Sequence, residues 1–190
     1  MTRQPTRTLA ACALAVAAAA PAFAANDLTG TTVDVNWLFP DATHSVAEQM
    51  VVVGAGAEIT CAGGNAGTGL CTQFVDGATI DLGAATLALS IDSGTSSWTN
   101  PAFNGYAFSG LAAGGTWTGY TLTTDFAGLD ASRITFSPDE VTVNMTGITP
   151  IAGQSFTITL LASAVPEPGN LALLLAGLGA LACAALRRRA

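Results

Sequence analysis

Hydrophobic and polar residues alternate along several short segments of this chain. In residues 32–39 one side carries the apolar positions, which are Val33, Val35, Trp37 and Phe39. The same period of two recurs in residues 86–91, 134–136, 141–145 and 156–160. This period, in segments rich in Thr and Val, is typical of strands with one buried and one wet face. Trp37, inside the clearest alternation, is predicted to lie in the core.

Turn-forming residues separate these segments at short intervals: Asp76-Gly77, Asp92-Ser93-Gly94, Asn104-Gly105 and Ser137-Pro138-Asp139. Asn104-Gly105 is the best candidate for a tight hairpin turn, because both residues tolerate positive φ. No segment between the two ends of the chain combines a helical period with caps. We therefore predict an all-β fold of about ten strands, a single antiparallel β-sandwich that is jelly-roll-like, with a flattened barrel as the alternative.

The first 24 residues have the pattern of a secretory signal peptide. Arg3 and Arg7 precede an unbroken apolar run over residues 9–20, and Pro21 ends it. Residues 22–24 place small side chains at the positions that a signal peptidase reads. We expect cleavage after residue 24, which leaves residues 25–164 as the exported domain.

The opposite end carries a second apolar run. Residues 171–186 contain seven Leu, six Ala and no charge. Sixteen residues at about 1.5 Å each give a helix of about 24 Å, which can insert in a bilayer core of about 30 Å if the bilayer thins. A basic tail over residues 187–190 follows, and cationic flanks stay cytoplasmic. We predict a transmembrane helix over 170–186 and place everything upstream outside the inner membrane.

Two prolines precede this helix. Pro166 and Pro168 hold Val165 and Glu167 in extended geometry. Proteases bind substrates as extended strands. Residues 165–169 are therefore predicted to form a cleavage or sorting signal; the alternative is an ordinary proline linker before a tail anchor.

The order Val-Pro-Glu-Pro, apolar helix and Arg cluster over residues 165–190 resembles the PEP-CTERM sorting signal. The sorting motif then falls on Val165, Pro166, Glu167 and Pro168, and the cytoplasmic basic anchor on Arg187, Arg188 and Arg189. The resemblance implies an exosortase of Gram-negative bacteria as partner, with export and transient insertion in the inner membrane. It also implies a membrane-anchored precursor that reaches the cell surface or the extracellular space, and association with exopolysaccharide and biofilm. One departure is Gly169-Asn170, where a hydroxyl residue often follows the motif.

The exported domain is strongly acidic. Residues 25–164 hold twelve acidic residues and one base, Arg133, for a net charge of −11, and the whole chain has no Lys. Such a domain is not expected to bind nucleic acid, whose affinity depends on neutralising phosphates. We predict no cofactor and no metal site, although diffuse binding of Ca²⁺, or Ca²⁺ bound by oxygens from several loops, stays open.

Two of the four cysteines fall in the exported domain. Cys12 leaves with the signal peptide and Cys183 lies in the apolar tail. Cys61 and Cys71 remain together in an oxidising compartment, where they are expected to form a disulfide. A metal site would need more ligands than two thiolates.

Residues suited to catalysis are scarce. His44 is the single histidine, and it would share a face with Asp41 and Glu48 only if residues 41–50 were helical. We favour a loop or short helix joining two strands. No G-x-S-x-G elbow occurs, and one His and one Arg in the domain leave few ways to assemble an acid, a base and an anion hole. We therefore predict that the protein is not an enzyme. A glycoside hydrolase is the weaker alternative, since it needs only a carboxylate pair.

Aromatic residues suggest a second function. Trp98 and Trp117 lie in the glycine-rich middle of the domain, where exposed rings would stack on sugars. Core aromatics are more common in small domains. The sequence therefore predicts an exported surface or matrix protein of unknown specific activity, with a carbohydrate-binding module as the alternative.

Overall fold

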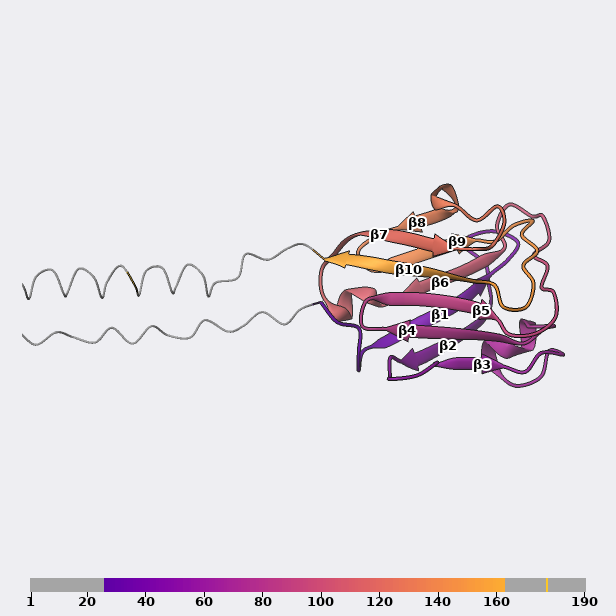
Figure 1. The fold of residues 1–190 in the computed structure, drawn as a ribbon, viewed down its shortest axis with the longest axis horizontal. Coiled ribbons are helices and arrows are strands. Elements are labelled where there is room, and N and C mark those ends of the chain that lie inside the picture. The colour runs from indigo at the N-terminus through magenta and orange to yellow at the C-terminus, as the bar shows by residue number, and fades with distance from the viewer. Residues whose placement is uncertain (1–25, 163–176, 178–190) are drawn as a thin grey trace, which may run out of the picture. The chain divides into compact units, whose positions relative to one another are not determined.

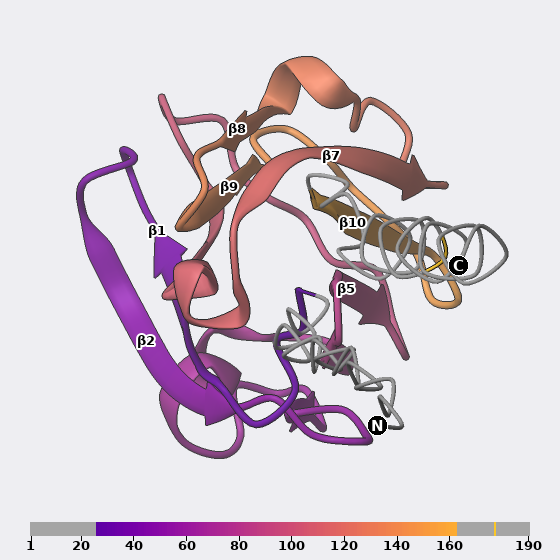
Figure 2. The ribbon, with the colours of Figure 1, turned by 90° about the vertical axis from the view of Figure 1, so that its left-hand side faces the viewer.

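The computed structural model describes residues 26–162 and residue 177. Residues 26–162 fall in one compact unit, Ala24–Ser163, and form two five-stranded antiparallel sheets (Figure 1). Figure 2 looks along the strands and shows β1 and β2 on one side, with β5 and β10 on the other. No α-helix occurs between residues 26 and 162. The predicted all-β sandwich is confirmed.

The first sheet has the order β2-β1-β6-β9-β8. Its strands are β1 (Thr32–Leu38), β2 (Ser45–Val52), β6 (Gly105–Ser109), β8 (Ile134–Phe136) and β9 (Glu140–Asn144). The second sheet has the order β3-β4-β5-β10-β7. Its strands are β3 (Ile59–Cys61), β4 (Ala78–Gly83), β5 (Thr86–Ile91), β7 (Trp117–Thr124) and β10 (Ser155–Ala162). Three short 3₁₀ turns join strands: η1 (Gly69–Gln73), η2 (Leu111–Gly114) and η3 (Ala131–Arg133).

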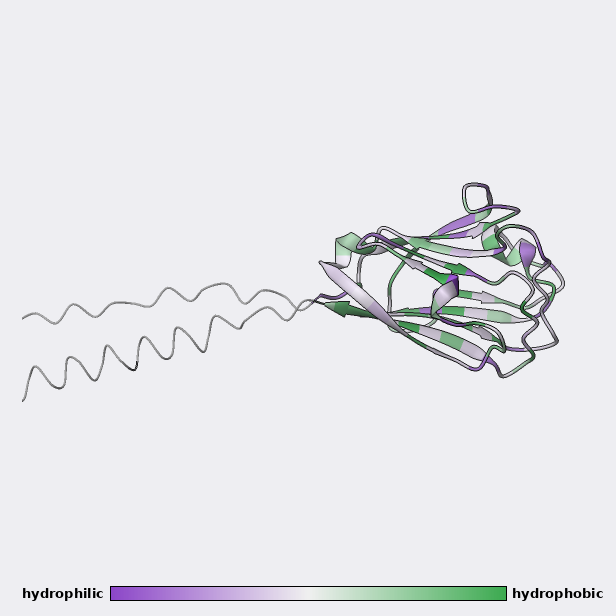
Figure 3. Cartoon of the chain, turned by 90° about the horizontal axis from the view of Figure 1, so that it is seen from above, coloured by the Kyte–Doolittle hydropathy of each residue, from purple (hydrophilic) through white to green (hydrophobic). Residues whose placement is uncertain are grey.

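The core lies between the two sheets and follows the alternation in the sequence (Figure 3). In β5 and β10 every second side chain is buried: Leu87, Leu89, Ile91, Phe156, Ile158 and Leu160. Phe156 lies opposite Leu89 and Ile158 opposite Leu87 in the ladder. Burying such side chains stabilises the fold by about 1.5–3 kcal/mol each, so the two central strands anchor the second sheet.

Strand β1 departs from the predicted alternation at its end. Trp37 faces inward, opposite Tyr106, but it is only half-buried. The strand stops at Leu38, so Phe39 leaves the ladder and is 37% exposed. The prediction that Phe39 faces the core is therefore wrong. Leu38 is buried instead in a small separate cluster with Phe103 and Ala107.

Asn104-Gly105 is not a hairpin turn. Gly105 begins β6 and pairs with Leu38 on one side and Asn144 on the other. A Cβ at Gly105 would collide with the carbonyl oxygen of Val143, so glycine is needed for close strand approach. The sequence pair Asn-Gly fits a turn and a close approach equally well, and here the second applies.

Both ends of the described domain lie at one end of the sandwich (Figure 1). The Asn26 side chain donates to the carbonyl of Thr116, and the amide of Asp27 donates to the carbonyl of Gly114 at 2.8 Å. Ala162 pairs with Trp117 in the same region. Strand β1 runs away from this end and reaches Trp37 about 16 Å beyond Thr32, at about 3.3 Å per residue. We call these the terminal end and the Trp37 end.

Among the described residues, no helix has the length and apolarity needed to cross a bilayer. The predicted signal peptide over 1–24 and the predicted helix over 170–186 lie outside the described residues, apart from residue 177.

Candidate functional site

Four aromatic rings meet at the Trp37 end of the sandwich. The ring centroid of Trp37 lies 5.5 Å from that of Tyr106, 5.7 Å from Phe74 and 6.2 Å from Trp98. Tyr106, Phe74 and Trp98 are buried, whereas Trp37 is half-buried. Trp37 is thus the ring of this cluster that reaches solvent.

Trp37 forms part of two neighbouring hollows of about 210 Å³ and 270 Å³. The first is lined also by Phe74, Val75, Asp76, Thr95, Ser96 and Trp98. The second is lined also by Phe39, Val46, Thr99 and Asn104. Gln73 and Ser97 contribute to both. Of the seven large apolar side chains exposed in the described domain, three line these hollows, so apolar surface gathers at this site.

Asn104 fixes the orientation of the Trp37 ring. Its Oδ1 accepts a hydrogen bond of 3.0 Å from the indole Nε1 of Trp37. Its Nδ2 donates to the hydroxyl of Thr99 at 3.2 Å, and its carbonyl accepts from the amide of Met145 at 2.8 Å. Asn104 is only 4% exposed, so these bonds satisfy a buried amide. Asn104 therefore ties strand β1, the first wall of the hollows, to the loop that carries Thr99.

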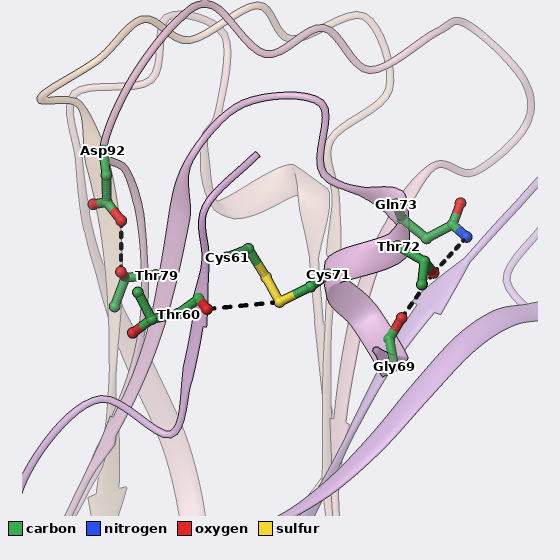
Figure 4. Close-up of a disulfide and its surroundings, with 8 residues drawn as sticks. All are labelled: Thr60, Cys61, Gly69, Cys71, Thr72, Gln73, Thr79 and Asp92. Carbon is green, nitrogen blue, oxygen red and sulfur yellow. Dashed lines mark hydrogen bonds between the residues drawn. A yellow bond between two sulfur atoms is a disulfide. The ribbon is translucent and has the colours of Figure 1, made fainter. Parts of the chain in front are cut away.

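The second wall of the hollows is η1, which the disulfide between Cys61 and Cys71 anchors (Figure 4). The predicted pairing is confirmed, with the two Cα atoms 5.1 Å apart. Cys71 lies in η1, which leads directly to Gln73 at the hollows. Within η1 the Gln73 amide donates to the hydroxyl of Thr72 at 3.1 Å. The covalent bond thus anchors the segment that presents Gln73.

The loop between the two cysteines also holds this wall. The amide of Gly64 donates to the carbonyl of Val75 at 2.6 Å, and that of Asn65 to the carbonyl of Phe74 at 2.8 Å. Gly63 has φ +89, and a Cβ there would lie 2.9 Å from the carbonyl oxygen of Val75. The glycines therefore let the loop pack against the backbone that carries Phe74 and Val75.

The third wall is the loop that carries Trp98. Backbone hydrogen bonds join Trp98 to Ile148 at 3.0 Å and to Gly147 at 2.8 Å. The indole nitrogen of Trp98 and the hydroxyl of Tyr106 are buried without a hydrogen-bond partner in the described structure. Burial raises the pKa of Tyr106 well above its ordinary value of 10.0, and the neighbouring Trp98 opposes that shift only in part. Tyr106 is therefore neutral at every physiological pH.

The two tryptophans predicted to stack on sugars are both buried. Trp98 is 3% exposed and Trp117 is 2% exposed. Trp117 donates its indole N–H to the carbonyl of Leu111 at 2.9 Å, which satisfies it inside the core. Neither ring offers the exposed face that stacking requires. The alternation of its strand predicts a core position for Trp37, and only its place next to the last residue of β1 distinguishes it.

A larger and more open groove of about 690 Å³ lies between edge strands β7 and β8. Its apolar lining includes Tyr120, Leu122 and Phe136. Tyr120 donates its hydroxyl to the carbonyl of Ala131 at 3.2 Å. Asp130 accepts from the amide and hydroxyl of Ser132, which lowers its pKa. These polar groups serve the fold, so the groove is a seam between two sheet edges.

The residues considered for catalysis are not assembled. Strand β2 contains Glu48 and extends from Ser45, which removes the helical face that would have joined Asp41, His44 and Glu48. Thr43 donates to the Asp41 carboxylate through its hydroxyl and its amide, and these bonds lower the pKa of Asp41. In the described part of the chain, no three His, Cys, Asp or Glu side chains gather to hold a metal ion.

The fold and its disulfide define an acidic, disulfide-stapled β-sandwich that is joined at Ala162 to a separate C-terminal segment. That segment carries the PEP-CTERM protein-sorting motif, which matches residues 164–189. The predicted resemblance is confirmed. The motif implies an exported protein with a membrane-anchored precursor and an exosortase as its processing partner.

The predicted motif residues Val165 to Pro168 and the basic residues Arg187 to Arg189 fall within this match and outside the described structure. No curated protein and no solved structure shows significant similarity to the chain.

Proposed function

We propose that this protein is a non-enzymatic component of the cell surface or extracellular matrix, delivered as a membrane-anchored precursor and cut free by an exosortase. A signal peptidase removes residues 1–24, and the helix over 170–186 holds the precursor in the inner membrane. The folded cargo then reaches the surface, where it associates with exopolysaccharide. The sorting motif at residues 164–189, directly after the folded domain, carries this proposal.

The disulfide supports the exported location. Bonds such as Cys61–Cys71 form and persist in oxidising compartments and are rare in the bacterial cytoplasm. The carboxylates favour this proposal over the glycoside hydrolase alternative. A glycosidase needs two carboxyl groups about 5–9.5 Å apart across its substrate. Asp76 is the one carboxylate that lines the Trp37 hollows, and Asp130 is the one that lines the β7–β8 groove.

Intact mass spectrometry of the envelope-derived protein tests this function. In cells with an active exosortase, the mature protein is expected to begin at residue 25 and to lack Arg187 to Arg189. In cells without exosortase, the C-terminal residues are expected to remain. If the protein from both strains retained Arg187 to Arg189, processing by the exosortase would be contradicted.

A further inference from the structure

We propose that the two hollows beside Trp37 bind consecutive neutral sugar units of a polysaccharide. This inference rests on the proposed function, because it assigns the polysaccharide contact to particular residues. It also moves the contact away from Trp98 and Trp117, whose rings are buried.

The chemistry of the lining suits a sugar. A half-buried indole offers an apolar surface to the C–H face of a sugar ring, and Trp37 lines both hollows. Gln73 and Ser97 reach both hollows and supply amide and hydroxyl groups, which donate to and accept from sugar hydroxyls. Each hollow is smaller than the roughly 300–1,000 Å³ of a typical ligand pocket, which suits one unit in each.

The charge of the domain selects neutral polymers. Residues 25–164 carry twelve acidic side chains against a single base, Arg133. Arg133 is occupied, because its guanidinium donates to the carbonyl of Thr146 at 2.7 Å. Asp76 lines one of the hollows. A polymer of uronic acids would therefore be repelled, whereas a neutral chain loses nothing on approach.

The site is held in place before any ligand arrives. The disulfide fixes the Gln73 segment, and Asn104 fixes the Trp37 ring at 3.0 Å. Binding to a preformed site costs little conformational entropy, which favours affinity from a small contact. The described domain ends at Ala162, at the terminal end, which is the end of the sandwich opposite to Trp37.

Affinity electrophoresis of the full-length chain tests the proposal. The protein is kept in a polyoxyethylene detergent, because sugar detergents would compete for the site. It is run through gels that contain the neutral or the acidic fraction of the producing cells' own exopolysaccharide. We expect retardation by the neutral fraction, at least tenfold weaker in Trp37→Ala and several-fold weaker in Gln73→Ala. Trp37→Phe keeps an aromatic face but loses the bond to Asn104, so it should lose less binding than Trp37→Ala.

Tyr120→Ala is the matched control, because Tyr120 is a half-buried aromatic residue in the β7–β8 groove. It is expected to bind like the wild type, and thermal melts of all variants show whether each is folded. No retardation by the neutral fraction, stronger retardation by the acidic fraction, or equal losses in Trp37→Ala and Tyr120→Ala would each overturn the site. The intact mass is independent of these results, so a failed site leaves the sorting function standing, and an unprocessed tail contradicts sorting without touching the site.

Discussion

The two ends of the sandwich each contain tryptophan, but they use it in opposite ways. At the terminal end Trp117 is 2% exposed and its indole N–H is satisfied by Leu111. At the Trp37 end the ring of Trp37 is half-buried beside two hollows. The first arrangement is that of a core, and the second is that of a surface prepared for a ligand. The exposed fraction of each ring, rather than its position in a glycine-rich region, distinguishes a core tryptophan from one at the proposed binding site.

The largest expected difference between the ends is in stability. Trp117→Ala removes a buried ring and should lower the free energy of unfolding by about 3–5 kcal/mol. Trp37→Ala removes a half-buried ring and should cost less than half as much. Urea unfolding followed by circular dichroism measures both. If Trp37→Ala were the more costly substitution, Trp37 would be a core residue and the contrast would fail.

The disulfide should matter mainly at the Trp37 end. Replacing Cys61 and Cys71 together by Ser should lower the free energy of unfolding by about 2–4 kcal/mol, because the unfolded chain regains the freedom of the closed loop. The same variant should bind neutral polysaccharide more weakly, since η1 carries Gln73. Unfolding of the wild type with and without reductant is the matching measurement. A wild type that is equally stable in both would show that the bond is not needed.

Asn104 should connect stability with the geometry of the hollows. Asn104→Ala leaves the Trp37 indole N–H and the Thr99 hydroxyl without their partner and should cost about 1–3 kcal/mol. Thr118→Ala is the control at the terminal end, where an exposed hydroxyl donates to Leu161 at 3.1 Å, and should cost less than about 0.5 kcal/mol. Near-ultraviolet circular dichroism should change only for Asn104→Ala. Equal spectra for the two variants would separate Asn104 from the ring.

The smallest expected effect concerns pH. Hydrogen bonds from Thr29 lower the pKa of Asp27 at the terminal end, and those from Thr43 lower the pKa of Asp41 at the other. A folded pKa below the unfolded value means that the stabilisation is present above the unfolded value, about 3.9, and is lost as the pH falls through the folded value.

Urea midpoints between pH 6 and pH 2 should therefore fall more steeply for the wild type than for Asp41→Asn, whose side chain does not titrate. Protonation of the other carboxylates reduces their mutual repulsion equally in both proteins. Comparing the two proteins at the same pH therefore removes that contribution. A steeper fall in Asp41→Asn would show that the bonds from Thr43 do not favour the charged carboxylate.

The fold was predictable because alternation extends through whole strands. The buried positions of β5 and β10 follow a strict period of two, and the turns between strands carry Gly, Asn and Asp. The disulfide was predictable because two cysteines remained in an oxidising compartment. The sorting motif was predictable because its residues are contiguous and need no tertiary structure.

The Trp37 site was not predictable, because its parts come from segments distant in sequence. Trp37, Gln73 and Ser97 meet only after β1, η1 and the loop that follows β5 are packed together. Alternation says which side of a strand Trp37 faces, but not that the strand ends one residue later at Leu38. The hairpin turn that the sequence predicts at Asn104-Gly105 is wrong for a related reason. Gly105 serves strand packing, while the side chain of Asn104 is buried against Trp37.

The central claim is that the folded domain lies outside the inner membrane and is joined to a C-terminal sorting signal that is recognised in the bilayer. A dual reporter fused after residue 164 tests it most directly, with alkaline phosphatase active only after export and a green fluorescent protein active only in the cytoplasm. The account predicts phosphatase activity without fluorescence. Fluorescence without phosphatase activity would contradict it.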